Sequence, residues 1–280
     1  MIGRFFAGLW LGLDGLRKFL HLVLLLVIFG FVVGALRTSI PHIEDGSALV
    51  LAPRGEIVEQ LTGDPIDQAI ARAQGTRQSE TLLWDLVDAL AAAKKDKRIK
   101  AVVLDLDDMS SGGLPTLSEL TSAIKDFRSS GKKVIAHSTY YGQEQYFVAS
   151  VADEIYLDPL GFVAIDGFER FRTFYKDLFD KIGVQMNVFR VGAYKSAAEV
   201  YIRNDMSPED REESLAYLNS LWTSYRTAVA EARGLKPEDI TAYVANSVPA
   251  LLAAKGDAAK VALMPSSSPG SSRRSKWNAA

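Results

Sequence analysis

An unbroken apolar run near the start of the chain constrains its fold more than any other feature. Residues Phe19–Leu36 are apolar throughout except for His21. At about 1.5 Å per residue, a helix of this length spans roughly the hydrocarbon thickness of a bilayer. We therefore predict a single transmembrane helix over residues 19–36, followed by a polar linker over residues 37–47.

The charges on either side of this run predict its orientation. Arg4, Arg17 and Lys18 precede it, whereas Arg37 is soon followed by acidic residues. Because positive residues favour the cytoplasmic side, we expect residues 1–18 to form a cytoplasmic N-terminus. The soluble bulk of the chain would then lie on the periplasmic side of an inner (cytoplasmic) membrane that the chain crosses once.

A cleavable signal peptide is the alternative interpretation of the same run. Val33 and Ala35 stand at the small-x-small spacing of a cleavage site after an apolar core. Residues 1–18 are long for the charged region of a signal peptide, so we favour a retained anchor.

The composition excludes several classes of protein. Apolar residues make up 48% of the chain and charged residues 24%, which suits a folded protein and excludes wholesale disorder. A net charge of −2 leaves no overall positive field to attract nucleic acid. The absence of cysteine excludes disulfides, thiolate metal sites and cysteine nucleophiles, and three histidines are too few for a histidine-rich metal site.

Beyond residue 47, short apolar runs alternate with amphipathic segments. Runs such as Ala101–Leu106 are apolar enough for strands buried on both faces of a parallel sheet. Strands are expected at Ala48–Ala52, Ala101–Leu106, Lys133–His137, Glu154–Leu157 and Val184–Val191. Between them, apolar residues recur at spacings of three and four, which indicates helices packed on the sheet. The strand, helix, strand order implies right-handed crossovers and an α/β architecture.

Local signals predict where the helices begin and end. Thr116 and Glu119 stand at the spacing of a capping box. Ser207 and Pro208 suit the cap and first position of a long helix that ends at Gly234. The buried face of that helix is expected at Leu215, Leu218, Leu221, Trp222, Tyr225 and Val229. Other helices are expected near residues 82–90, around residues 146–151, and from residue 171 to a stop at Gly183.

Lys195 is the candidate catalytic residue that the sequence singles out. It follows Gly192 just beyond an expected strand, in a stretch with little other charge. A lysine acts as a general base only when burial in an apolar pocket lowers its pKa from about 10.4 toward neutrality. The small neighbours Ala193, Ala197 and Ala198 permit such burial. The alternative is a solvated surface lysine, which is the commoner state of this residue type.

The residues around this lysine resemble a known family. The segment VFRVGAYKSAAE at 188–199, followed by YIRNDMSPEDRE at 201–212, is similar to the N-terminal half of the long form of signal peptide peptidase A, the protease IV family. The resemblance extends back through residues 104–134 and 140–168 to the N-terminal anchor, and forward to about Leu263. Its most specific part is the YKSA segment.

This resemblance implies a fold and an activity. Members of the family are membrane-anchored serine endopeptidases that degrade cleaved signal peptides, built on a Clp protease/crotonase-like domain with a parallel sheet and flanking helices. We expect that domain over residues 48–263. The lysine that matches Lys195 is the general base of a Ser–Lys dyad, in which a neutral amine takes the proton of the attacking serine. The family also implies apolar peptides and the lipid bilayer as partners, a homo-oligomer that is a tetramer in the family, and no metal, nucleotide or organic cofactor.

The resemblance places the nucleophile elsewhere, because the serine of the family belongs to a second homologous half. We expect a second half or a partner chain to supply it. Residues Tyr140–Ser150 match the corresponding turn without a serine flanked by small residues. Ser196 is expected to be structural or a hydrogen-bond partner of the lysine amine. Gly112 and Gly113 resemble an oxyanion-binding turn but are expected to be a turn alone, and His137 is expected to end a strand as a polar rim residue.

Residues 264–280 form a serine-rich tail without the helical periodicity that precedes it. We expect the tail to be disordered, as its composition suggests, or to result from a frameshift. A shifted reading frame could encode residues similar to those that follow this point in members of the family. Two other functions stay open. A truncated or frameshifted product could be a non-catalytic peptide-binding or assembly module. An acyl-CoA enzyme of the crotonase type is disfavoured by the anchor and the YKSA segment.

Overall fold

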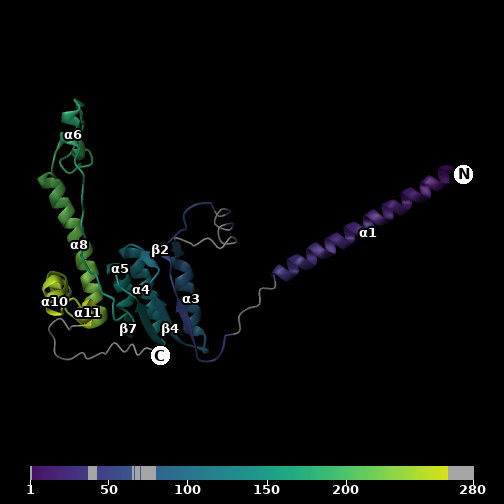
Figure 1. Cartoon of the computed structure of the whole chain (residues 1–280), viewed down its shortest axis with the longest axis horizontal. Helices are drawn as coiled ribbons and strands as arrows, with labels where there is room; N and C mark the ends of the chain where they lie inside the picture. The colour runs from purple at the N-terminus through teal and green to yellow at the C-terminus, as the bar shows by residue number, and fades with distance from the viewer. Residues whose placement is uncertain (1, 37–42, 65, 67–69, 71–79, 264–280) are drawn as a thin grey trace. The chain divides into compact units, whose positions relative to one another are not determined.

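The computed structural model describes residues 2–36, 43–64, 66, 70 and 80–263 (Figure 1). The chain divides into two units, Met1–Glu44 and Asp45–Ala280. The predicted linker over residues 37–47 spans their boundary. Residues 37–42 of that linker and the predicted tail over residues 264–280 lie outside the described residues.

The first unit contains one long helix, α1 (Ile2–Leu36). Its segment Trp10–Gly34 is 25 residues long with a mean hydropathy of 2.2, which is long and apolar enough to cross a membrane. This confirms the predicted apolar helix and extends it toward the N-terminus. A membrane anchor and a signal sequence both have this length and composition, and the orientation in the membrane stays a prediction.

Four parallel strands form the larger sheet of the second unit. They are β1 (Ser47–Leu51), β4 (Ile99–Asp105), β6 (Lys133–Ser138) and β7 (Glu154–Leu157), in the order β1-β4-β6-β7. Val102, Val134 and Ala136 are fully buried, as expected for apolar strands covered on both faces. The parallel pairing confirms the predicted α/β class, and four of the five predicted strands are present.

A second, smaller parallel sheet was not predicted. It consists of β2 (Gly55–Val58), β3 (Glu80–Leu82) and β5 (Met109–Ser111), in the order β3-β2-β5. Each strand has only three or four residues. Runs this short carry too little periodicity to be distinguished from loops in a sequence.

Three helices pack beside these sheets: α3 (Leu83–Lys95), α4 (Leu114–Arg128) and α5 (Gln143–Ala149). Helix α4 contacts both sheets through β2 and β6, and it buries Leu117, Ile124 and Phe127 completely. The predicted capping box at Thr116 and Glu119 is wrong. Helix α4 begins earlier, directly after Gly113, whose φ of 67° suits glycine, and a proline occupies its first turn.

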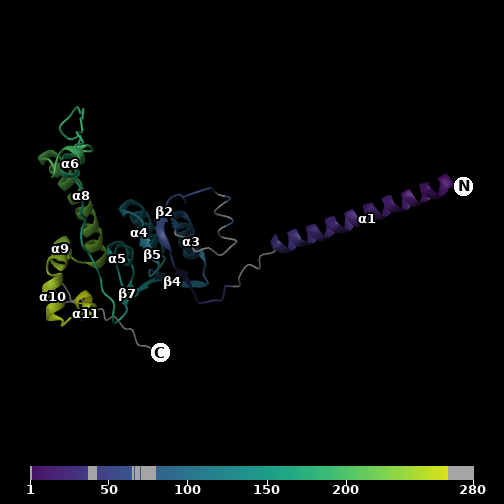
Figure 2. The ribbon, with the colours of Figure 1, turned by 45° about the horizontal axis from the view of Figure 1, so that its top comes forward.

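Residues 171–217, here called the arm, lead away from the sheets (Figures 1 and 2). The arm contains α6 (Lys176–Lys181), α7 (Glu199–Ile202) and the first part of α8 (Pro208–Arg233). The predicted strand over Val184–Val191 is wrong, because no described strand lies beside it to complete a ladder. The helix predicted from residue 171 is shorter than expected, and its stop at Gly183 is confirmed by a φ of 72° there.

Helix α8 has the ends that the sequence predicts. The Ser207 side chain accepts a hydrogen bond from the backbone N–H of Asp210, and Gly234 closes the helix with a left-handed φ of 67°. The predicted buried face is correct only at its C-terminal end, where Tyr225 and Val229 are buried. Leu215 is 51% exposed, because this part of the helix belongs to the arm.

Three short helices follow α8. They are α9 (Pro237–Ala245), α10 (Ser247–Ala253) and α11 (Ala258–Leu263). Helix α9 packs on α8, and the hydroxyl of its Tyr243 donates a hydrogen bond of 2.8 Å to the Val163 carbonyl. Helix α5 also contacts α8, through Tyr225, so the C-terminal half of α8 is packed against two helices.

Candidate functional site

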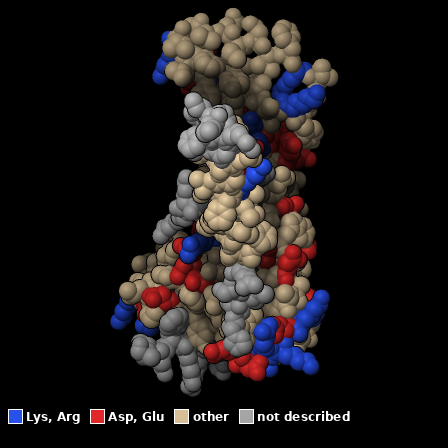
Figure 3. All heavy atoms as spheres, turned by 90° about the vertical axis from the view of Figure 1, so that its right-hand side faces the viewer, with Lys and Arg blue, Asp and Glu red and all other residues tan. Residues whose placement is uncertain are grey.

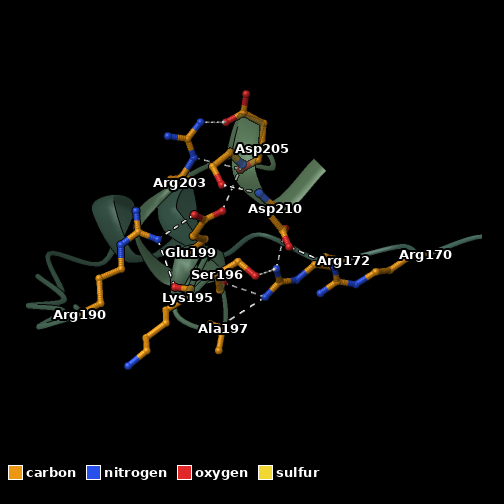
Figure 4. Close-up of polar contacts among 11 residues, drawn as sticks. Arg170, Arg172, Arg190, Lys195, Ser196, Ala197, Glu199, Arg203, Asp205 and Asp210 are labelled. Atoms are coloured by element: carbon orange, nitrogen blue, oxygen red, sulfur yellow. Dashed lines mark hydrogen bonds and ion pairs between the residues drawn. The ribbon is translucent and has the colours of Figure 1, made fainter. Parts of the chain in front are cut away.

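Lys195 lies on an exposed turn of the arm, between residues 184–191 and α7. Gly192 begins the turn with a φ of 106°, and its carbonyl accepts a hydrogen bond of 3.4 Å from the backbone N–H of Lys195. The lysine side chain points away from the neighbouring carboxylates (Figure 4). Among the described residues, none forms a hydrogen bond or ion pair with its amine. The small neighbours that permit burial of this lysine do not bury it in the chain by itself.

An ion pair between the partly exposed Arg190 and the buried Glu199 lies directly behind the Lys195 turn. One guanidinium nitrogen of Arg190, Nη1, donates to Oε1 of Glu199 at 2.8 Å and to the Lys195 carbonyl at 3.2 Å. The other carboxylate oxygen of Glu199 accepts the backbone N–H of Ser207 at 3.1 Å. Burial opposes ionisation of Glu199, which has no exposed surface, but the bonds from Arg190 and Ser207 outweigh it and hold the pKa of this carboxyl below its usual range.

A second buried carboxylate extends this network along the arm (Figure 4). Asp210 has no exposed surface and accepts hydrogen bonds from Arg170 at 3.0 Å and from Arg172 at 2.7 Å. Arg172 also donates to the carbonyls of Ser196 at 3.1 Å and Ala197 at 3.4 Å. Burial opposes ionisation of Asp210, but the bonds from Ser196, Arg172 and Arg170 lower the pKa of its carboxyl.

Ser196 does not pair with Lys195 in the structure. Its side chain is nearly buried, and its hydroxyl accepts a hydrogen bond of 3.4 Å from Arg172. It points toward the buried carboxylates, whereas the lysine amine points the other way (Figure 4). This agrees with the structural role expected for Ser196 and gives no support to a bond between its hydroxyl and the amine.

The arm around Lys195 exposes many large apolar side chains. Phe189 is 97% exposed, Val191 85% and Phe171 84%. Other exposed members are Leu178, Ile182, Val184, Met186, Tyr194 and Tyr217. On the face in Figure 3, charged side chains gather over the lower part, whereas the top, which is the α6 end in Figure 1, is mostly uncharged. Exposed apolar surface of this extent is typical of an interaction site.

The glycine turn between β5 and α4 holds a carboxylate rather than an open pair of N–H groups. The N–H of Gly112 donates to Oε2 of Glu144 at 2.9 Å. Burial raises the pKa of the Glu144 carboxyl, although the bond from Gly112 acts in the opposite direction. The turn expected here is present, but the sequence did not indicate its partner Glu144, which comes from the first turn of α5.

The segment Tyr140–Ser150, which contains helix α5, uses polar side chains for internal contacts. The buried amide of Gln145 donates to the carbonyls of Leu106 and Met109 at 2.8 and 2.9 Å. The Ser150 hydroxyl is buried and donates to the carbonyl of Phe147 at 2.7 Å. The Gln145 side chain therefore holds α5 beside the sheets, whereas the Ser150 hydroxyl bonds only within the last turn of α5.

Within the described part of the chain, one group has the composition of a metal site. Asp105, Asp107 and His137 each offer a ligand atom, and these atoms lie within 4.8 Å of one another. His137 stands opposite Asp105 on the adjacent strand, with 3.6 Å between its Nε2 and a carboxylate oxygen. Asp107 accepts hydrogen bonds from Ser138 and from the backbone N–H of Thr139. His137 lies near the end of β6 and is partly exposed, as predicted for a rim residue.

The functional class follows from comparison with known proteins. The family model of peptidase family S49 matches residues 126–264, which include the Lys195 turn and the network behind it. The chain belongs to this family of serine peptidases.

Two curated relatives carry the name Protease 4, and the chain is homologous to them. The Salmonella typhi protein is 34% identical over 93% of this chain and 44% of its own length. The Haemophilus influenzae protein is 40% identical over 62% of this chain and 28% of its own length. The chain thus spans less than half the length of these relatives.

Among solved structures, an enoyl-CoA hydratase from a Polaromonas species covers 80% of this chain and 91% of its own. It shares 14% sequence identity, with a TM-score of 0.28. Such a score adds nothing to the parallel α/β fold that the strands themselves show.

Proposed function

We propose that the chain is a membrane-anchored unit of an S49 serine peptidase that supplies Lys195 as the general base of a Ser–Lys dyad. A second half or a partner chain supplies the serine. The observation that carries this proposal is the position of Lys195, on an exposed turn with a fixed backbone, within an arm of uncovered apolar side chains. A second protein surface that covered the arm would meet the amine.

The chemistry explains why such a cover is needed. A serine hydroxyl is a weak nucleophile until a nearby base takes its proton. An amine can accept that proton only in its neutral form, and exclusion of water favours the neutral form. Lys195 is exposed in the chain by itself, so the surface that brings the serine must also remove water from the amine. Assembly and activation are then one event.

The substrates we propose are apolar peptides, including cleaved signal peptides. Burial of apolar peptide side chains supplies binding free energy, while backbone hydrogen bonds fix the register of the peptide. Helix α1 would hold the peptidase unit at the bilayer in which such peptides are released. The uncovered arm supports a homo-oligomer as the working state.

A non-catalytic peptide-binding module is the second candidate. Two observations favour it: the Ser196 hydroxyl is engaged by Arg172, and the Gly112 N–H is occupied by Glu144. This chain would then hold peptides without hydrolysing them.

The test is cleavage of a fluorogenic signal peptide by the full chain in detergent micelles, alone and as a chimera. In the chimera the chain replaces the matching part of the Salmonella typhi relative, whose remainder is retained. We expect cleavage in the chimera and a loss of about a hundredfold or more in K195A, the size of a general-base contribution. K125A, which changes an exposed lysine of α4 outside the arm, should keep full activity. Undiminished cleavage by K195A would contradict the dyad, and peptide binding without cleavage in every form would favour the module.

A further inference from the structure

We propose that Arg190 and the buried Glu199 are positioning residues that hold the backbone of Lys195 in place before the serine arrives. This inference rests on the proposed function, because it gives the network a task in the same dyad. All the contacts that support this inference lie within this chain. The guanidinium of Arg190 bridges the buried Glu199 carboxylate and the turn that holds Lys195.

The contacts of Arg190 couple the turn to helix α8. Its Nη1 is shared between Glu199 at 2.8 Å and the Lys195 carbonyl at 3.2 Å. Glu199 accepts the backbone N–H of Ser207, which is the N-cap of α8. The side chains of Arg190 and Glu199 therefore connect the Lys195 carbonyl to the start of a 26-residue helix.

Arg172 does the same for the next two residues. It donates to the carbonyls of Ser196 and Ala197 and is anchored on Asp210, in the first turn of α8. Three consecutive carbonyls, those of residues 195–197, are thus held by guanidinium groups paired with carboxylates that have no exposed surface. Backbone bonds alone would leave this turn with few restraints.

Helix α8 transmits this restraint to the sheets. Its Tyr225 is buried, and the hydroxyl donates to the Gln143 carbonyl of α5 at 3.0 Å. The path from the sheets to Lys195 therefore runs through a helix and two ion pairs. The apolar side chains of the arm do not provide this path, because they are exposed.

Stability alone does not account for such a network. A carboxylate that loses its hydration rarely stabilises a fold more than an apolar residue of the same size, even when it is paired with a cation. The better-attested use of such pairs is to select one geometry. A dyad needs its groups within about 0.5 Å of the productive position, and an exposed lysine reaches that precision only if its backbone is fixed. The network fixes the backbone and leaves the amine free to meet a partner.

The test compares R190K with R203K in the full chain in detergent micelles. Lysine keeps a positive charge for Glu199, but its single ammonium group does not reproduce the planar fork of a guanidinium. Arg203 is a matched control, because it lies in the same arm and pairs with the exposed Asp205. Amide hydrogen exchange over residues 193–199 reports on the turn, whether or not the chain cleaves peptides.

We expect R190K to speed exchange of these amides by about tenfold, the effect of losing one hydrogen bond to a charged group, while β4 and β6 keep their protection. In the cleaving chimera, kcat should fall about tenfold with an unchanged KM, since the substrate-binding surface is untouched. R203K should match the wild type in both measurements.

Unchanged exchange in R190K would overturn the inference. So would faster exchange throughout the second unit, because that result would show a purely structural role. The proposed function is tested separately, by whether the K195A chimera still cleaves the peptide. If K195A kept full cleavage while R190K loosened the turn, the dyad would be wrong although the turn is held as described.

Discussion

The sheets and the arm are built on opposite principles. The sheets are held by apolar side chains: Phe127 of α4 and Val134 of β6 have no exposed surface. The arm leaves Phe189 and Val191 almost fully exposed and instead buries two carboxylates, Glu199 and Asp210. A region that buries charge and exposes apolar surface is poorly explained as a core. It is well explained as a surface prepared for a partner and held in shape by its ion pairs.

The largest expected effect contrasts apolar residues of the two regions. F127A should lower the free energy of unfolding by about 3–5 kcal/mol, because it removes a fully buried ring and leaves a cavity. F189S should change it by no more than about 0.5 kcal/mol, because that ring is already in water. Urea denaturation followed by circular dichroism measures both. Similar losses in the two variants would break the comparison.

Next in size is the removal of a buried charge from the arm. D210A should cost about 3 kcal/mol, because it leaves Arg170 and Arg172 without their common carboxylate. D205A is the control, since Asp205 forms an exposed pair with Arg203 and such pairs contribute at most about 1 kcal/mol. Denaturation curves of the two variants give the difference. If D210A were as mild as D205A, the ion pairs would not hold the arm in shape.

The same carboxylates predict that acid loosens the arm. The pKa values of Glu199 and Asp210 are lowered in the folded chain from ordinary values of 4.5 and 3.8. Their ionised forms therefore stabilise the fold above these ordinary values, and this contribution is lost as the pH falls through the lower folded values. Hydrogen exchange over residues 188–212, corrected for the intrinsic effect of pH, should accelerate below about pH 4, earlier than exchange in β4.

E199Q sharpens this test. It removes one of the two titrating groups, so the acid-dependent part of the exchange should shrink while the part due to Asp210 remains. An arm whose protection is independent of pH down to the acid unfolding of the sheets would contradict the role of the carboxylates.

The smallest expected effect lies in the sheet region, at the glycine turn before α4. E144A removes the acceptor for the Gly112 N–H at a helix end that has no cap of its own, so it should cost about 1 kcal/mol. E144Q keeps an acceptor oxygen and should cost less. Thermal unfolding measures both variants. A loss in E144A as large as that in D210A would mean that the sheet region also depends on its charges.

What the sequence predicts follows the same division. Strands such as Glu154–Leu157 and the ends of α8 at Ser207 and Gly234 carry local signals, and these predictions are confirmed. The strand expected at Val184–Val191 is wrong because its recurring apolar residues indicate burial, and no strand among the described residues pairs with this segment. Local patterns do not distinguish an apolar strand from an apolar surface that awaits a partner.

The network behind Lys195 could not be predicted from the sequence. Arg190 and Glu199 are nine positions apart and face each other across a turn, while Arg172 reaches Asp210 from 38 positions away. Pairings of this kind depend on the fold, not on spacing. Lys195 itself stands out in the sequence by its place after Gly192, and the family resemblance implies its role as general base, which stays a prediction.

The central claim is that a second protein surface covers Lys195 when the peptidase unit becomes active. The most direct measurement is acetylation of lysine amines, quantified by mass spectrometry, in the dilute chain and in the cleaving chimera. We predict that Lys195 is labelled as readily as Lys125 of α4 in the dilute chain, because both are exposed, and is protected in the cleaving form, where Lys125, which lies outside the arm, is still labelled. Equal labelling of the two lysines in a form that cleaves peptides would contradict it.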